Sequence, residues 1–362
     1  MSSAAVPKTT NRWVLAEHVP KDRPLTKDFF RWETDVALRE IQDGELLVKV
    51  AHLGMEPSMK GTFTQEKSYR PAHPLGAPLW ALGIADVLAS KSSKYSAGDR
   101  IFGYVGQESN AIIKEDSPLL QKLHPALGKQ ALSLLGPPGL AAHVGLMNVA
   151  KCTKDDIVLV SAAAGATGSI VIQLAKALGV KKVVGIASSR KLDAVLETGA
   201  DAAVGYDSPS FLEDLRKATN EEVSVYFENV GGKVLDAALE VMAPNGRIAL
   251  CGVISEYQGQ EEPIRGVRWI LKKKLLLEGF ICNQRGPEAL LTAIKELTQW
   301  GIEGKRGPEA LLTAIKELTQ WGIEGKVKTN IHTYQKKGLE HAPDALLALL
   351  NGENTGKMVL DL

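Results

Sequence analysis

The fold is decided by the stretch Val158-Leu-Val-Ser-Ala-Ala-Ala-Gly165-Ala-Thr-Gly168-Ser169. Its apolar first half predicts a buried strand, and the apolar spacing that follows predicts an amphipathic helix from Ile170 to Leu178. A glycine turn between a strand and a helix is typical of a site for a dinucleotide pyrophosphate. Gly165 allows a tight turn, Gly168 lets the helix pack on the sheet, and the helix N-terminus offers unpaired N–H groups to phosphates.

The spacing departs from the usual fingerprint, because Ala162 stands where the first glycine is expected. Two glycines at a helix start can also serve packing alone, so the pattern by itself leaves a purely structural turn open. A second apolar strand, Lys182-Val-Val-Gly-Ile-Ala187, follows about twenty residues later, as a βαβ nucleotide site requires. This context favours nucleotide binding.

The end of that second strand indicates which nucleotide is bound. An acidic residue there would accept hydrogen bonds from the adenosine ribose and repel a 2′-phosphate. The chain instead reads Ser188-Ser-Arg-Lys191, which offers two hydroxyls and two cations. The segment favours NADPH over NADH. The alternative is that Arg190 and Lys191 are the solvated first turn of a helix, although the helix dipole disfavours cations at that end.

Length and composition are those of a two-domain globular protein. The chain has 362 residues, 44% hydrophobic and 23% charged, with a formal net charge of +1. Its three cysteines are too few and too scattered for a disulfide framework or a structural zinc site. No apolar run approaches the length that spans a bilayer. We expect a soluble cytoplasmic protein with no bound metal and no nucleic-acid or membrane partner.

Two textures follow each other along the chain. From Arg12 to about Leu127, short alternating strands are separated by Gly and Pro, which predicts a compact β-rich unit. After Leu127, strands alternate with helical segments, which predicts a parallel, doubly wound sheet. The six predicted strands are Ile157–Ser161, Lys182–Ala187, Ala202–Val204, Val223–Glu228, Arg247–Cys251 and Leu275–Cys282. The chain closes with a predicted helix, Ala342–Leu350, and a predicted strand, Lys357–Leu362.

A 21-residue segment occurs twice in tandem. Residues 285–305 are repeated without change as 306–326, and each copy predicts one amphipathic helix that starts at a proline and stops at a glycine. Two copies do not make a solenoid. We interpret the repeat as an in-frame duplication, natural or artefactual, in which one copy fills the single helix position that the fold offers.

Several motifs together resemble one family. They are the glycine turn, the Ser-Ser-Arg-Lys segment, Tyr226-Phe-Glu-Asn-Val-Gly-Gly232, Cys251-Gly-Val-Ile-Ser-Glu-Tyr257, Gly279-Phe-Ile281 and Gly352-Glu-Asn-Thr-Gly-Lys-Met-Val359. In this order they resemble the zinc-independent medium-chain dehydrogenases/reductases, and more narrowly the prostaglandin reductase, leukotriene hydroxydehydrogenase and alkenal double-bond reductase group.

The resemblance implies an α/β fold in which a doubly wound Rossmann domain is inserted into a β-rich GroES-like domain. It implies a GroES-like part over residues 1–127, an NADPH-binding domain over 128–329 that contains the duplication, and a return to the GroES-like domain over 330–362. A homodimer is also expected from the family. Its zinc-dependent relatives need a cysteine cluster in the β-rich domain, and here no cysteine precedes Cys152.

The resemblance also implies site residues. Lys191 would hold the 2′-phosphate, Tyr206 would contact the adenosine phosphate region, and Asn229, Phe280 and Asn354 would line the nicotinamide and ribose side. The full predicted cofactor set is Gly165, Ala166, Thr167, Gly168, Ser188, Arg190, Lys191, Tyr206, Asn229, Cys251, Tyr257, Phe280, Ile281 and Asn354.

The implied reaction is NADPH-dependent reduction of the carbon-carbon double bond of an α,β-unsaturated ketone or aldehyde. Such a reaction needs a hydrogen-bond donor for the enolate oxygen rather than a metal. Tyr257 matches the family's active-site tyrosine; it either donates the proton or only orients cofactor and enolate, since a phenol has a reference pKa of about 10. The alternatives are an NADPH quinone reductase and a nucleotide-binding protein without catalysis.

Two segments of the chain depart from the family pattern. Glu56-Pro-Ser-Met-Lys-Gly61 stands where Asp-Pro-Tyr-Met-Arg-Gly is usual, so a pocket aromatic is replaced by Ser58. Ala141 lacks a hydroxyl that is common there, and His143 replaces a tyrosine. We expect a wider or more polar substrate mouth. His143 is interpreted as a hydrogen-bonded helix histidine, with a polar role in the substrate cleft as the alternative.

Overall fold

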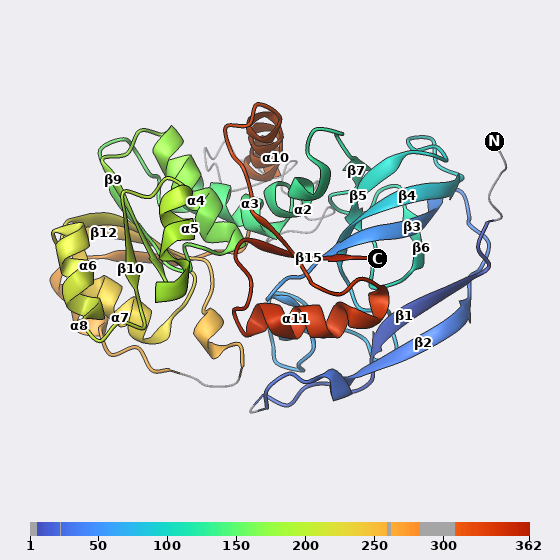
Figure 1. Cartoon of the computed structure of the whole chain (residues 1–362), viewed down its shortest axis with the longest axis horizontal. Helices are drawn as coiled ribbons and strands as arrows, with labels where there is room; N and C mark the ends of the chain where they lie inside the picture. Colours follow the sequence, from blue (N-terminus) through green and yellow to red (C-terminus); the bar gives the residue numbers. More distant parts are fainter. Residues whose placement is uncertain (1–5, 22, 259–261, 283–307) are drawn as a thin grey trace, which may run out of the picture. The chain divides into compact units, whose positions relative to one another are not determined.

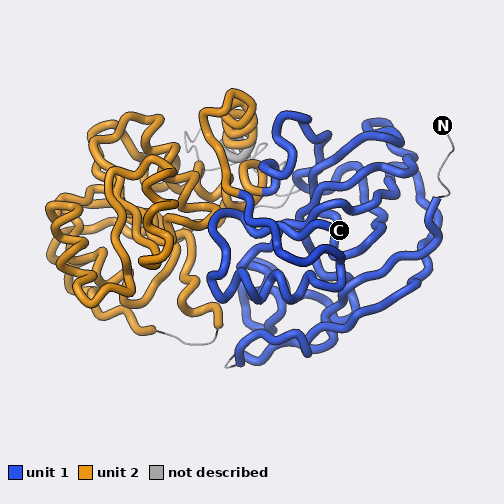
Figure 2. Tube along the Cα trace, in the orientation of Figure 1, with its two compact units in different colours: residues 1–132, 331–362 blue, residues 133–330 orange. Residues whose placement is uncertain are grey.

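The computed structural model describes residues 6–21, 23–258, 262–282 and 308–362; for residues 308–312 only the backbone is described. The chain divides into two compact units, one formed by residues 1–132 and 331–362 and the other by residues 133–330 (Figure 2). Among the described residues, no helix is both long and apolar enough to cross a bilayer. The cytoplasmic location stays a prediction.

The first unit is rich in β-strands, as expected. β1 (Thr9–Leu15) and β2 (Phe30–Ala37) form an antiparallel pair, and a seven-stranded sheet has the order β14-β15-β3-β4-β5-β7, with β6 paired to β3. The sheet strands are β3 (Glu45–Gly54), β4 (Leu82–Ser90), β5 (Arg100–Tyr104), β6 (Asn110–Lys114), β7 (Gln121–Lys122), β14 (Ile331–Thr333) and β15 (Lys357–Asp361). The described helices are α1 (Met59–Thr62), α2 (Ala131–Leu134), which crosses into the second unit, and α11 (Ala342–Leu350).

The second unit is built on a six-stranded parallel sheet (Figure 1). Its order is β10-β9-β8-β11-β12-β13, so the chain winds outward from the centre in both directions. The strands are β8 (Ile157–Val160), β9 (Lys182–Ala187), β10 (Ala202–Gly205), β11 (Val223–Glu228), β12 (Met242–Leu250) and β13 (Leu276–Gly279). This is the doubly wound Rossmann arrangement, and the predicted fold class is confirmed.

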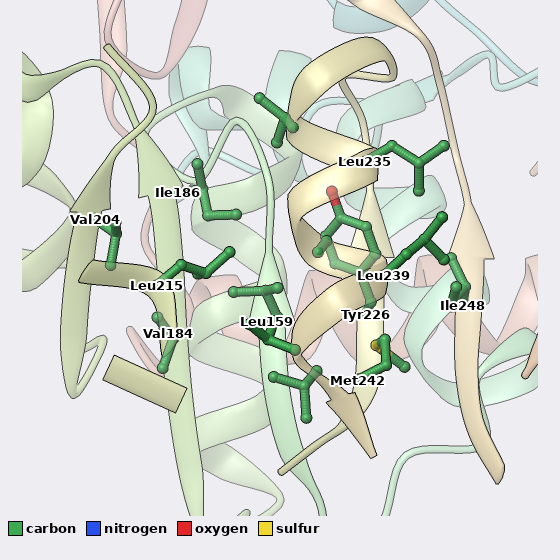
Figure 3. Close-up of a cluster of buried hydrophobic side chains, with 14 of the residues drawn as sticks. Leu159, Val184, Ile186, Val204, Leu215, Tyr226, Leu235, Leu239, Met242 and Ile248 are labelled. Atoms are coloured by element: carbon green, nitrogen blue, oxygen red, sulfur yellow. The ribbon is translucent and has the colours of Figure 1, made fainter. Parts of the chain in front are cut away.

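Helices cover both faces of this sheet. They are α3 (Pro137–His143), α4 (Ala166–Ala177), α5 (Leu192–Glu197), α6 (Phe211–Thr219), α7 (Gly232–Val241), α8 (Val267–Lys272) and α10 (Pro308–Ile323). Val184 and Ile186 face α6 and α7 in the core cluster drawn in Figure 3. Gly185 faces the other way, where a Cβ would lie 2.4 Å from Val195 of α5 and 3.8 Å from Ile172 of α4. The alternation of β9 side chains thus separates the two helical layers.

Three predicted boundaries are wrong by three residues or more. β13 ends at Gly279 rather than at Cys282. α4 begins at Ala166 rather than at Ile170, because its first turn consists of small residues that carry no apolar period. β12 begins at Met242 rather than at Arg247; Asn245 adopts a φ of +61°, and the pairing with β11 shifts register at this point. Because Pro244, Asn245 and Gly246 are typical turn residues, the sequence predicts a turn here and not the first part of the strand.

α10 belongs to the second copy of the duplicated segment and packs beside α3. Ala314 and Leu318 are completely buried. His143 of α3 is also buried, and its Nε2 lies 2.6 Å from Oε2 of Glu317, while its ring is 6.2 Å from that of Trp321. His143 is therefore a hydrogen-bonded helix histidine, as interpreted from the sequence. The first copy, residues 285–305, lies outside the described residues.

Removing one copy of the duplicated segment should preserve fold and activity, because one helix is enough to supply the buried Ala314 and Leu318 positions. The two copies are identical, so deleting residues 285–305 or 306–326 gives the same chain. The measurement is the yield of soluble protein and its Tm. Loss of soluble expression on deletion would show that both copies are structurally required.

Substitutions in single copies identify the copy that packs in the core. Leu318→Ala should lower the free energy of unfolding by about 2–5 kcal/mol, as large-to-small core changes do. The identical change at the matching position of the other copy, Leu297→Ala, is the control, and we expect it to cost less. Equal losses in urea denaturation would contradict this assignment.

Candidate functional site

The glycine turn between β8 and α4 brings backbone very close to backbone. A Cβ at Gly168 would lie 2.5 Å from the carbonyl oxygen of Ala162 and 2.8 Å from Cα of Ala163. At Gly165 the nearest atom, again the Ala162 oxygen, would lie at 3.1 Å. Only glycine fits at 168 without moving the backbone. The turn thereby fixes where α4 starts.

The start of α4 is suited to an anion. Gly165 is its N-cap residue and no side chain caps the helix, so the first amides keep their N–H groups for another acceptor. Gly165, Ala166 and Thr167 are half-exposed, whereas Gly168 is buried. Ala162 has a φ of +47°, a left-handed conformation that costs a residue with a Cβ about 1–2 kcal/mol. The missing first glycine is thus tolerated at a cost in strain.

The Ser188–Lys191 segment follows β9 directly as a short turn. Ser188 is in extended conformation, and its hydroxyl oxygen is buried without a hydrogen-bond partner in the described part of the chain. Lys191 is half-buried, and burial together with the neighbouring Arg190 lowers the pKa of its ammonium. A phosphate dianion at this place would accept a hydrogen bond from Ser188 and stabilise the charge of Lys191.

The structure places an acid here that the linear sequence does not reveal. Asp207, just after β10, accepts hydrogen bonds from the backbone N–H of Ser189 at 2.8 Å and from its hydroxyl at 2.5 Å. These two bonds lower the pKa of Asp207, which keeps it ionised. As expected, no acidic residue follows β9 directly in the sequence. In the folded chain, however, Asp207 lies beside Ser189 at the end of β9. The adjacency of β9 and β10 was the signal that could have found Asp207.

Tyr206 precedes Asp207 at the same edge. Its side chain is 37% exposed, and the ammonium of Lys233 lies 5.7 Å from the ring centroid. Lys233 stands in the first turn of α7 and adds a third cation to this end of the sheet. Tyr206 and Lys233 thus form a cation–π pair where the adenosine side of a nucleotide was expected.

Asn229 is fixed by Ser161, the residue that opens the glycine turn. Its backbone N–H donates to Ser161 Oγ at 2.8 Å, and its side-chain Nδ2 donates to the Ser161 carbonyl oxygen at 2.8 Å. The completely buried Glu228 joins them through a 3.4 Å hydrogen bond from Ser161 Oγ. This network ties the end of β11 to the end of β8.

Tyr257 and Asn229 both lie close to Gly252, at the carboxyl edge of the sheet. Tyr257 follows the short 3-10 turn Ile254–Glu256, and a Cβ at Gly252 would lie 3.4 Å from its hydroxyl oxygen and 3.6 Å from the carbonyl oxygen of Asn229. Cys251, at the end of β12, is half-buried, and burial raises the pKa of its thiol. The structure therefore brings Asn229, Cys251 and Tyr257 to one edge.

Phe280 and Ile281 follow β13 at the same carboxyl edge, where the backbone N–H of Phe280 donates to the carbonyl oxygen of Leu250 at 3.3 Å. Phe280 is buried edge-on against Phe227, with ring centroids 6.1 Å apart, and Ile281 follows it half-buried. Asn354 lies in the other unit, where its Nδ2 donates to the Gly356 carbonyl oxygen at 2.6 Å. Contact of these three residues with a cofactor stays a prediction.

The segment that carries Asn354 is held by a buried ion pair. Lys357 pairs with Glu56 and donates to the carbonyl oxygen of Met55 at 2.7 Å. Burial raises the pKa of Glu56 and lowers that of Lys357, while their mutual attraction opposes both shifts. The pair links β15 to the motif in which Ser58 replaces a family aromatic.

The described residues contain no group of three or more His, Cys, Asp or Glu side chains arranged to hold a metal ion. This statement does not reach the residues outside the described ranges. Independence from zinc stays a prediction that rests on the absence of cysteines before Cys152.

Two family models match the chain. A model described as "N-terminal domain of oxidoreductase" matches residues 11–120, and one described as "Zinc-binding dehydrogenase" matches residues 166–299. An NADPH-dependent curcumin reductase of Escherichia coli (strain K12) is 31% identical over 359 residues, which cover 96% of both chains. The chain belongs to the medium-chain dehydrogenase/reductase family. Within it, the chain falls in the group of the prostaglandin, curcumin and alkenal reductases.

Further members of the group support this placement. Prostaglandin reductase 1 of Oryctolagus cuniculus is 31% identical over 353 residues, covering 95% of this chain and 91% of that protein. The crystal structure of CurA from Vibrio vulnificus in complex with NADPH superposes with a TM-score of 0.80 at 29% identity, covering 97% of this chain and 98% of that one. The resemblance seen in the sequence motifs is confirmed.

Proposed function

We propose that this protein is an NADPH-dependent reductase of the carbon-carbon double bond in α,β-unsaturated ketones or aldehydes. The observation that carries the proposal is that Asn229 and Tyr257 both lie close to Gly252 at the carboxyl edge of a doubly wound sheet, where open α/β folds bind ligands. Full-length similarity to curcumin and prostaglandin reductases supports it.

NADPH fits the residues that are present. The start of α4 has no side-chain cap, and Gly165 has no side chain to block a pyrophosphate there. The Ser188 hydroxyl, which has no partner among the described residues, and the ammonium of Lys191 could bind the 2′-phosphate. Tyr206 suits the adenosine side. The half-exposed amides of Ala166 and Thr167 lie where phosphate oxygens would accept hydrogen bonds.

The chain's own residues stabilise the reduced substrate. When bound, NADPH supplies a hydride to the β-carbon of the alkene. Charge then collects on the substrate's carbonyl oxygen, and the Tyr257 hydroxyl is the donor that we propose for this enolate oxygen. The α-carbon takes its proton from Tyr257 or from water. Asn229, fixed by Ser161, holds the neighbouring backbone in place.

A panel of electron acceptors tests the function. NADPH oxidation should be fast with an enone or enal, slow with a quinone and negligible without an acceptor. The assay is run after exhaustive chelation, because we propose that no zinc takes part. Preference for quinones would favour the quinone reductase, whereas NADPH binding without turnover of any acceptor would indicate a non-catalytic protein. Activity that disappears on chelation and returns with zinc would overturn the metal-free proposal.

Cofactor preference should depend on Lys191. Lys191→Glu should weaken binding of NADPH more than that of NADH by at least the tenfold that about 1.4 kcal/mol represents, because it replaces a cation by an anion beside the 2′-phosphate. Kd values for both cofactors are measured by fluorescence titration. Lys181→Glu, the same change at the exposed opposite end of β9, is the control. Equal losses for NADPH and NADH would remove the 2′-phosphate assignment.

Tyr257 should act on turnover rather than on cofactor binding. Tyr257→Phe should reduce kcat with an enone by about a hundredfold, a typical loss for a proton donor, and leave the Kd of NADPH nearly unchanged. Tyr69→Phe, the same change at an exposed tyrosine of the β-rich unit, is the matched control and should keep its kcat. Wild-type turnover in Tyr257→Phe would assign the proton to a ribose hydroxyl or water.

A homodimer is proposed as the working form. Among the described strands, β13 lies at one edge of its sheet, and Leu276 in it and Leu271 before it are 57% and 82% exposed. An apolar sheet edge is a place where another strand can pair. Sedimentation velocity should give twice the chain mass, and a monomer would contradict the proposal.

A further inference from the structure

Glu228 is a carboxyl group that the proposed reduction does not use. It is the last residue of β11, and its side chain is completely buried. Its Oε1 accepts hydrogen bonds from the backbone N–H of Val230 and, at 2.6 Å, from that of Gly231. Its Oε2 is buried and has no hydrogen-bond partner within the described residues. A bare buried carboxylate oxygen is costly, and a proton on it removes the charge.

Among the described residues, the titratable group that interacts with Glu228 is the thiol of Cys251, which follows β12 and also interacts with Cys282. No described cation is among the groups that shift the pKa of Glu228. Burial raises the pKa of Glu228 to about 7, although the N–H groups of Gly231 and Val230 act in the opposite direction. Both protonation states are therefore accessible near neutral pH.

Glu228 is linked to the glycine turn after β8 and to Asn229, two parts of the proposed nucleotide site. The hydroxyl of Ser161, the residue before the turn at Ala162, lies 3.4 Å from Glu228 Oε1 and 3.4 Å from the carbonyl oxygen of Phe227, and these two acceptors share its single proton. Ser161 Oγ also accepts the backbone N–H of Asn229. A change of charge on Glu228 thus acts directly on the hydrogen bonds that hold the glycine turn and Asn229 together.

We propose that Glu228 is a positioning residue of the nucleotide site and that its carboxyl takes up a proton from solvent when NADPH binds. The inference rests on the proposed function. The proton goes to Oε2, no covalent bond to the cofactor forms, and the negative charge of Glu228 is lost. Because Glu228 is already completely buried, the drive comes from the negative phosphates at the start of α4, which disfavour a second negative charge on its carboxyl.

Isothermal titration calorimetry of NADPH in buffers of different ionisation enthalpy measures this proton. At about pH 8 the wild-type chain should take up a fraction of a proton more than Glu228→Gln does, because glutamine keeps the acceptor oxygen and cannot titrate. Titration of the 2′-phosphate and of Lys191 contributes equally to both proteins. Glu222→Gln, the same substitution at the exposed entrance of β11, is the control and should match wild type.

The outcomes separate the two proposals. Absence of NADPH binding to wild type would refute the proposed function. NADPH binding with equal proton uptake in wild type and Glu228→Gln would overturn the role of Glu228 and leave the function intact. If Glu228→Gln does not fold, infrared difference spectra of wild type with and without NADPH decide the question. A new protonated-carboxyl band supports the proposal, and its absence contradicts it.

The Tm gives a second readout in the absence of cofactor. The folded-state pKa of Glu228, about 7, lies above its usual value of 4.5, so its contribution to stability is complete below pH 4.5 and is lost as the pH rises through 7. The Tm of wild type should therefore fall relative to that of Glu228→Gln between pH 5 and pH 9. A constant difference in Tm would contradict a titrating Glu228.

Discussion

The second unit depends on the close approach of Gly168 to the backbone of Ala162 and Ala163. A Cβ at position 168 would lie 2.5 Å from a carbonyl oxygen, so the start of α4 can approach this backbone so closely only with glycine at position 168. The contact lies after the end of β8. In the sheet, β8 has β9 on one side and β11 on the other. At such a switch point the loops leave in opposite directions and open a crevice for a ligand. One backbone contact thus fixes both the helix and the place where phosphates can meet it.

Much of this unit could be predicted because its strands are buried on both faces. β9 and β11 are short apolar runs that end at polar or turn residues, and their bounds agree with those expected from the sequence. The order of the strands is not written in any of them; it follows from the alternation of strands and helices and from the handedness of their connections. Boundaries were less predictable where small or turn-forming residues sit inside an element, as in the first turn of α4 and around Asn245 of β12.

The candidate site also contains residues whose positions the sequence indicates and residues whose positions it does not. Gly165 and Ser188 follow their strands directly, so the chain itself indicates their positions. Asp207 is separated by 18 residues from the Ser189 that it binds, and Glu228 acts on Ser161 from 67 residues away. Both contacts arise because parallel strands end side by side, β10 beside β9 and β11 beside β8. The sequence indicates the groups that a strand presents at its own end, whereas those that a neighbouring strand supplies become visible only in the structure.

The discovery of Asp207 changes the physical argument for cofactor choice. Selectivity for a 2′-phosphate cannot be ascribed to a lack of negative charge, since an ionised carboxylate is bound to Ser189. That carboxylate oxygen already accepts two hydrogen bonds from the protein, which lowers its capacity to accept ribose hydroxyls as the acid of an NADH site does. Lys191, whose charge is disfavoured by burial and by Arg190, gains most from a dianion beside it. The proposed preference for NADPH therefore rests on the attraction of Lys191 and Arg190 for the 2′-phosphate, which must exceed the repulsion from Asp207.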